Sequence, residues 1–252
     1  MMKLKNSWFN AIEQRTSRRA FKNQSMEQQK IDRIEALIQL LNDESGLHIQ
    51  FVHDGRRFLS GFKASYGMIS GRPSMITLVG NPSDPELKRK IGYYGEFLVL
   101  ECVSLGLGTC WLSGTFDRQE CRKAIQLAEA EELVCVIAVG LVPNNKTIKE
   151  NLISQMGKSK PSFEELLSEK DSTPPLWVAR GIEAARFAPS AVNKKPTAYR
   201  FLKNEVFVYA AKKNRDNEEI DLGISMAHFQ LGAMQGLKDG IWIKKDQGYL
   251  FV

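Results

Sequence analysis

Three arginines lie close together near the start of the chain, in the stretch EQRTSRRAF (13–21), with no acidic residue between them. Guanidinium groups bind phosphate through bidentate, charge-assisted hydrogen bonds, and hydroxyl groups supply further donors. In an extended segment alternate side chains share a side, so Arg15, Ser17 and Arg19 would face one way and Thr16 and Arg18 the other. The stretch therefore predicts a site for a phosphorylated ligand. Taken alone, it is better explained as a solvated basic loop whose arginines pair with nearby acids.

The other residue types that could do chemistry show no matching pattern. His48, His53 and His228 lack the spacing of metal ligands, and we expect packing or surface roles for them and no metal site. None of the four cysteines forms a C-x-x-C pair. We predict that they are buried free thiols in a reducing compartment: Cys102, Cys110, Cys121 and Cys135.

The composition is that of a globular chain with one large domain or two small ones: 252 residues, 43% apolar and 25% charged. The formal charge of +6 favours anionic ligands. Because the basic residues do not form one long run, a nucleic-acid partner is not favoured. The longest apolar run, FLVLECVSLGLG, is interrupted by Glu101 and too short to span a bilayer. With no signal-peptide pattern either, we expect a cytoplasmic protein without a membrane partner.

The elements that must position the arginines alternate between helices and strands, which indicates an α+β fold. Ser25 with Gln28 resembles a capping box ahead of a helix with apolar residues at helical spacing. DSTPP (171–175) is the clearest linker signal. The pattern predicts helices at 6–14, 26–46, 85–105, 117–128, 176–187 and 220–236, strands at 47–54, 75–79, 109–112 and 132–140, a polar loop from 141 onward with a helical turn at FEELL, a hairpin turning at Lys203-Asn204, and two short strands in GIWIKKDQGYLFV.

An internal repeat links the two parts of the chain. GEFLVLECVSLGLGTCWL from Gly95 and GISMAHFQLGAMQGLKDGIWI from Gly223 each contain a glycine, an apolar helix, a Gly-Leu pair and a tryptophan that opens a strand. The spacing from glycine to tryptophan is 16 residues in the first copy and 19 in the second. Two explanations of this similarity are open. Two amphipathic helices followed by strands can resemble each other by chance, or the chain can contain two related halves facing one another across a pseudo-two-fold axis.

Four stretches resemble motifs of the FMN-dependent nitroreductase family. RTSRRAF resembles its R-x-S-x-R-x-F segment, GLGTCWLSGTF (106–116) its glycine-rich strand entry, APSAVNKKP (188–196) its P-S-x-x-N-x-Q-P segment, and KSKPSFEEL (158–166) its late basic motif. Each motif is weak by itself, but together they cover most of the chain. The resemblance implies a nitroreductase-like α+β fold with central antiparallel sheets flanked by helices.

The order of these motifs departs from the family. Family members carry P-S-x-x-N early and form homodimers whose flavin sites combine segments of both subunits, whereas here the motif lies in the second half. The resemblance thus implies an intramolecular pseudo-dimer, with residues 1–170 as the first half and 171–252 as a second, shorter half. The second half has no R-x-S-x-R, so one FMN per chain and a monomer are expected.

The resemblance also implies roles for individual residues. Arg19 would approach the flavin edge where negative charge develops on reduction, and a cation there raises the reduction potential. Lys195 stands where the family has Gln, and Thr197 where an aromatic residue is common. The implied phosphate-binding residues are Arg15, Thr16, Ser17, Lys158 and Lys160; those near the flavin ring are Ser113 and Gly114; those closing the site are Pro189, Ser190, Asn193 and Lys195.

The implied activity is that of an FMN-dependent oxidoreductase, which takes hydride from NADH or NADPH and reduces a small nitroaromatic or quinone-like acceptor in a ping-pong cycle. The flavin carries this chemistry, so no catalytic protein side chain is expected. The alternative is an FMN-binding sensor or storage protein with little turnover, for which the altered residues at 195 and 197 leave room.

Overall fold

The computed structural model describes residues 2–59, 68–155 and 160–252 and has an α+β fold with two sheets. The chain divides into two compact units. Unit 1 comprises residues 1–3, 14–87 and 98–156, and unit 2 comprises residues 4–13, 88–97 and 157–252. None of the helices in the described ranges is both long enough and apolar enough to cross a membrane.

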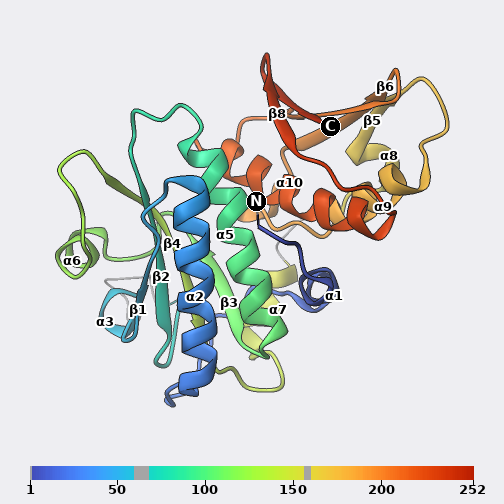
Figure 1. The fold of residues 1–252 in the computed structure, drawn as a ribbon. Helices are drawn as coiled ribbons and strands as arrows, with labels where there is room; N and C mark the ends of the chain where they lie inside the picture. The colour runs from blue at the N-terminus through green and yellow to red at the C-terminus, as the bar shows by residue number, and fades with distance from the viewer. Residues whose placement is uncertain (1, 60–67, 156–159) are drawn as a thin grey trace. The chain divides into compact units, whose positions relative to one another are not determined.

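Unit 1 is built around an antiparallel sheet in the order β1-β2-β4-β3. Its strands are β1 (Gln50–Val52), β2 (Ser74–Gly80), β3 (Gly108–Leu112) and β4 (Glu132–Gly140). The apolar run of β4 reflects its central place, with a strand on each side. Helix α2 (Gln28–Ser45) and the second half of α5 (Leu87–Ser104) lie side by side along this sheet (Figure 1), where Arg33 is 2.7 Å from Glu101. Short helices complete the unit: α3 (Arg56–Leu59), α6 (Arg118–Lys123) and α7 (Ile148–Gln155).

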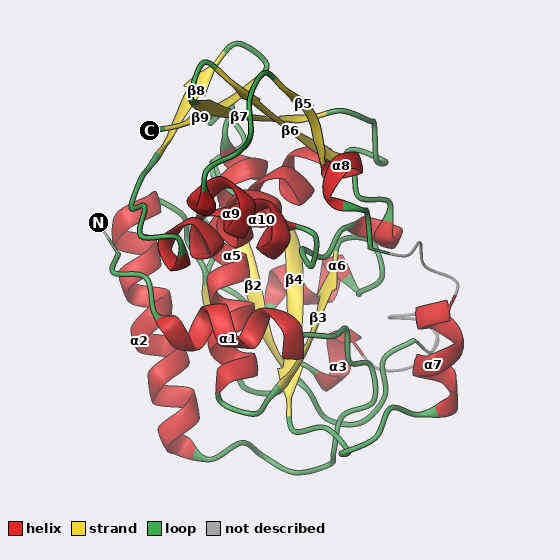
Figure 2. Ribbon diagram, turned by 90° about the vertical axis from the view of Figure 1, so that its right-hand side faces the viewer, coloured by secondary structure: helices red, strands yellow, loops and turns green. Residues whose placement is uncertain are grey.

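Unit 2 contains a five-stranded sheet in the order β5-β6-β7-β9-β8. Figure 2 shows this sheet lying over two packed helices, α9 (Leu176–Ala185) and α10 (Glu218–Gln235). Tyr199 and Phe229 stack at 5.2 Å in the core between them. The strands are β5 (Leu167–Lys170), β6 (Thr197–Leu202), β7 (Glu205–Ala210), β8 (Trp242–Lys245) and β9 (Gly248–Phe251), and the unit also holds α1 (Asn6–Gln14) for most of its length, α8 (Phe163–Leu166) and the short η1 (Ala191–Asn193).

The two sheets share one topology. In each repeat a helix precedes two antiparallel strands, an 18-residue helix follows, and two further strands close the sheet in the order first-second-fourth-third. Thus α2, β1, β2, α5, β3 and β4 correspond to α9, β6, β7, α10, β8 and β9. Strand β5 is an addition outside this scheme, and it pairs with β6 in parallel rather than antiparallel. Chance similarity between two amphipathic helices does not account for a match of strand order.

The long helices match residue by residue in a register that differs from the sequence alignment by three. Gly92, not Gly95, corresponds to Gly223, because each is the sixth residue of its helix. The spacing from glycine to tryptophan is then 19 residues in both copies, to Trp111 and to Trp242. The helix ends also correspond: Gly106 (φ 76°) and Leu237 (φ 61°) both adopt the left-handed conformation that terminates a helix.

Helices α5 and α10 touch through these matched glycines within unit 2. A Cβ atom on Gly92 would lie 2.0 Å from the carbonyl oxygen of Ile220, and one on Gly223 would lie 2.1 Å from that of Arg89. Arg89 and Ile220 are each the third residue of their helix. The sixth residue of either helix therefore meets the third residue of the other, which is the reciprocal pattern of an isologous contact.

Some local expectations were wrong. Helix α2 has Glu27, not Ser25, at its N-cap, without a side-chain cap. The polar stretch after residue 141 contains α7, where a loop was expected. The predicted halves 1–170 and 171–252 stay a prediction; the compact units divide the chain elsewhere, since unit 2 takes in residues 157–170 as well as 4–13 and 88–97.

Candidate functional site

The arginine-rich segment, residues 15–19, runs along the free edge of β3 in unit 1. Ser17 forms a parallel bridge with Thr109, and the backbone N–H of Arg18 donates to the Thr109 carbonyl at 2.8 Å. Gly108 makes this approach possible, because a Cβ there would lie 3.0 Å from the Cβ of Arg18. The glycine-rich stretch and the arginine-rich segment are thus neighbours, as the family resemblance implied.

Arg18 is the structural member of the cluster. Its side chain is buried, its Nε lies 3.2 Å from the Glu150 carboxylate, and its Nη2 donates to the carbonyl oxygens of Pro143 and Asn145 at 2.9 and 3.2 Å. The expectation that it faces away from Arg15 and Arg19 agrees with this burial. For Arg18, the alternative interpretation of the stretch therefore holds: this arginine pairs with a nearby acid.

Glu150 holds the segment in place from α7. Its carboxylate, 2% exposed, accepts hydrogen bonds from the backbone N–H groups of Arg19 (2.6 Å), Ala20 (3.2 Å) and Thr147 (2.8 Å). Burial raises the pKa of Glu150, but these N–H donors and Arg18 outweigh it and leave the pKa lowered to about 2. Glu150 is therefore an anion at neutral pH.

Arg15 and Arg19 supply the positive charge of the site. Both are half-buried, and both act electrostatically on the thiol of Cys110 in β3. Burial raises the pKa of Cys110, while the charges of Arg19 and Arg15 oppose that rise. The thiol is therefore neutral. The guanidinium groups of Arg15 and Arg19 and the hydroxyl of Ser17, at alternate positions of the segment, form a donor set that fits a phosphate monoester.

Ser113 and Gly114 follow directly after β3. The carbonyl oxygen of Ser113 accepts a hydrogen bond from Arg118 at 3.1 Å. Gly114 is exposed, and a Cβ there would meet nothing within 4 Å. A planar ring could approach this stretch of backbone without steric conflict.

The remaining predicted residues belong to unit 2, apart from Lys158, which lies outside the described residues. Lys160 is exposed and its Nζ stands 3.4 Å from the centre of the Phe187 ring. Pro189, Ser190 and Lys195 line one narrow cavity with Asp221 and Ser225. The Ser190 hydroxyl accepts from the N–H of Lys195 at 2.9 Å, and the N–H of Asn193 donates to the Ser190 carbonyl at 2.9 Å.

The histidines and cysteines, for which no role in the site was predicted, can be compared with their expected packing. His228 is fully buried, with Nε2 at 2.9 Å from Glu96 and Nδ1 at 3.2 Å from the Ala184 carbonyl oxygen, so it packs as expected. All four cysteines are buried free thiols, as predicted, whereas the reducing compartment stays a prediction. Within residues 2–59, 68–155 and 160–252, no group of three or more His, Cys, Asp or Glu side chains is arranged to hold a metal ion.

Sequence reasoning missed Glu150, although a signal was present. The stretch TIKE (147–150) has the S/T-x-x-E pattern of a capping box, and the Glu150 N–H does donate to the Thr147 hydroxyl at 3.2 Å. It also missed Asp221 and Asn214, two buried residues next to the Pro-Ser-x-x-Asn stretch. Nothing in the local sequence marks these two.

Comparison with known proteins identifies the family. The family described as "Putative TM nitroreductase" matches residues 7–233. The chain belongs to this family. No curated protein matches the chain.

Among solved structures, the fold is similar to that of a "putative nitroreductase" from Thermotoga maritima MSB8. The TM-score is 0.62 and the sequence identity 19%, with 100% of this chain and 96% of that chain covered. This similarity over the whole chain gives the nitroreductase-like fold. A nitroreductase with bound FMN from Desulfitobacterium hafniense DCB-2 is 20% identical, at a TM-score of 0.45, over 57% of this chain and 93% of that one.

Proposed function

We propose that this nitroreductase-family protein is an FMN-dependent NAD(P)H oxidoreductase that reduces small nitroaromatic or quinone-like acceptors. The observation that carries the proposal is the arginine-rich segment: Arg15 and Arg19 both act electrostatically on Cys110 in the edge strand β3, and Glu150 fixes the backbone at Arg19 and Ala20. This donor set and the family membership support FMN as the ligand.

In this proposal the chain binds and orients the cofactor. Arg15, Thr16 and Ser17 hold the phosphate through charge-assisted hydrogen bonds. Arg19 adds positive charge that stabilises a reduced flavin, and the backbone N–H groups of Ser113 and Gly114 orient the ring. When bound, FMN supplies the transfer of hydride and electrons between the nicotinamide and the acceptor. No protein nucleophile is needed, which fits the neutral state of Cys110. The flavin contacts of Lys158, Lys160, Pro189, Ser190, Asn193 and Lys195 stay predictions.

We further propose that the two repeats play the parts of two subunits. The shared strand order and the reciprocal contact of α5 with α10 support a pseudo-dimer. Because no R-x-S-x-R precedes α9, the chain should bind one FMN. Titration of the apoprotein with FMN measures this number; saturation at two per chain would refute it.

Anaerobic addition of NADH or NADPH to the FMN-loaded protein tests the activity. Rapid loss of the flavin absorbance, with reoxidation by a nitroaromatic or a quinone, is the expected result. Tight FMN binding without this bleaching would favour a sensor or storage role. A protein that retains no FMN would refute both.

A further inference from the structure

The Pro-Ser-x-x-Asn stretch has a backbone that its side chains disfavour. Val192 adopts φ 46° and ψ 25°, Asn193 φ 54° and Lys195 φ 50°. Left-handed conformations are rare for residues other than glycine and rarest for β-branched residues such as valine. Such a backbone persists only where the surrounding structure fixes it, and it concentrates at ligand-binding sites.

Two buried side chains fix this stretch at Ala191. The carboxylate of Asp221 accepts the N–H of Ala191 at 2.8 Å, and the amide of Asn214 donates to the carbonyl oxygen of Ala191 at 2.9 Å. The same amide donates to Asp221 at 2.6 Å. Asp221 and Asn214 thus hold both polar groups of one backbone residue, between Ser190 and the strained Val192.

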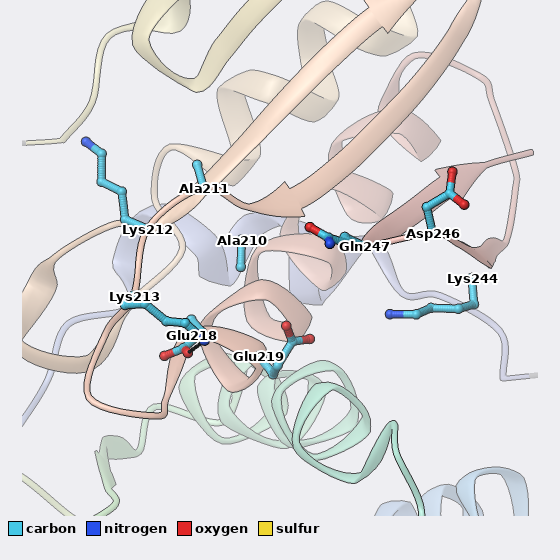
Figure 3. A pocket seen from close by; sticks show the side chains of 9 residues that line it. All are labelled: Ala210, Ala211, Lys212, Lys213, Glu218, Glu219, Lys244, Asp246 and Gln247. Atoms are coloured by element: carbon cyan, nitrogen blue, oxygen red, sulfur yellow. Dashed lines mark hydrogen bonds and ion pairs between the residues drawn. The ribbon is translucent and has the colours of Figure 1, made fainter.

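The pair is itself held by its neighbours. Asn214 is fully buried and Asp221 is 3% exposed. The Glu218 carboxylate accepts the backbone N–H of Asn214 at 3.0 Å and pairs with Lys213 at 2.9 Å. Lys213 and Glu218, which lie together in Figure 3, line an open groove of about 590 Å³. Neither Asp221 nor Asn214 lines that groove. Their contacts are instead with Ala191 in the Pro-Ser-x-x-Asn stretch.

We propose that Asp221 and Asn214 are positioning residues: together they hold Ala191 and thereby set Ser190 and Asn193 in the geometry in which this stretch binds the flavin. The effect on flavin binding rests on the proposed function, whereas the hold on Ala191 does not depend on it. The two side chains touch no reacting atom; they act through the backbone between them and the binding residues.

The charges around Asp221 give the pair a pH dependence that a passive packing contact lacks. Burial raises the pKa of Asp221 to about 6, while the N–H of Ala191, Asn214 and nearby Lys195 oppose the rise and Glu218 adds to it. Ser190 and Ser225 line the same cavity as Asp221. The N–H of Ala191 lowers this pKa because it stabilises the ionised carboxylate, so the ionised form holds Ala191 more tightly than the protonated form does. The hold on Ala191 should therefore strengthen as the pH rises from 5 to 7.

The test compares Asp221→Asn with Glu219→Gln, which removes a charge from the same helical turn outside the pair. In Asp221→Asn the new amide faces the amide of Asn214, donor against donor. Two quantities are measured: hydrogen-exchange protection of the Ala191 N–H in the apoprotein, and the dissociation constant for FMN. We expect Asp221→Asn to lower both protection and affinity at least tenfold, and to flatten the pH dependence between 5 and 7. Glu219→Gln should leave the protection, the affinity and their pH dependence unchanged.

Exchanging the two residues provides a rescue. Asp221→Asn combined with Asn214→Asp restores one donor facing one acceptor, and part of the Ala191 protection should return. If Asp221→Asn fails to fold, Asn214→Ala tests the same hold from the other side. Unchanged protection and affinity in both single variants would overturn the proposal. If the wild-type protein shows the protection but binds no FMN, the proposed function fails and only the hold on Ala191 survives.

Discussion

The carboxylate of Glu150 lies 2.6 Å from the backbone nitrogen of Arg19, and the same carboxylate pairs with the buried guanidinium of Arg18. One residue of α7 thus fixes the backbone of the arginine-rich segment and neutralises the one arginine that points inward. Arg18 is buried and paired with Glu150, whereas Arg15 and Arg19 are half-buried.

Replacing Glu150 should damage both stability and ligand binding. Glu150→Gln leaves the Arg18 charge buried without a counter-ion, so we expect the free energy of unfolding to fall by about 3 kcal/mol. FMN affinity should fall as well, because the backbone at Arg19 loses the carboxylate that fixes it. Chemical denaturation and FMN titration measure the two effects. Glu120→Gln, which removes an exposed partner of Lys123, is the matched control and should change neither.

The same carboxylate makes the protein sensitive to acid. The pKa of Glu150 in the folded state is lowered to about 2 from the ordinary value of 4.5. Its contribution to stability is therefore complete above pH 4.5 and lost as the pH falls toward 2. Denaturation curves of the apoprotein between pH 5 and 3 should show stability decreasing, with a shallower decrease in Glu150→Gln. Equal slopes in the two proteins would contradict the assignment.

The phosphate assignment is tested by removing the cations. Arg15→Ala together with Lys160→Ala should weaken FMN binding at least about tenfold for each charge-assisted bond lost. The thermal midpoint of the apoprotein should change little, because neither side chain is buried in a core. Lys123→Ala removes a cation paired with Glu120 and serves as control. Retention of FMN in the double variant would refute the role of these residues.

The matched glycines of α5 and α10 should be equally intolerant of a methyl group. Gly92→Ala and Gly223→Ala each place a Cβ within about 2 Å of a carbonyl oxygen of the other helix. We expect each to lower the free energy of unfolding by about 3 kcal/mol, despite the better helix propensity of alanine. Gly114→Ala, where the added methyl group meets nothing, is the stability control. A large loss in one variant and none in the other would contradict the reciprocal contact.

Much of the fold was predictable because its signals are local. The run ELVCVIAVG gave the bounds of β4, and the Lys203-Asn204 turn was recognisable because asparagine tolerates the left-handed conformation that it adopts there. The register of the repeat was not predictable, because Gly95 lies as close to an apolar run as Gly92 does. Only the approach of Ile220 shows which glycine is needed.

The residues that position the candidate site were the hardest to predict. Glu150 is 131 residues from Arg19 in the chain, and Asp221 is 30 residues from Ala191. The binding residues belong to short motifs with a recognisable order. The residues that position them, such as Glu150 and Asp221, belong to elements that are distant in the chain and become neighbours only in the fold. A single sequence does not show which elements these are. The capping pattern of Thr147 and Glu150 indicated a helix start, but not the partner of its carboxylate.

The contact of α5 with α10 joins two different stretches of one polypeptide. Where two identical chains meet, every mutation appears on both sides at once. Here a change at Gly92 leaves Gly223 as it was, so each copy can drift independently, and a loss on one side can be compensated on the other. A duplicated architecture of this kind can abandon one binding site and reshape the other, a freedom that a symmetric assembly does not have.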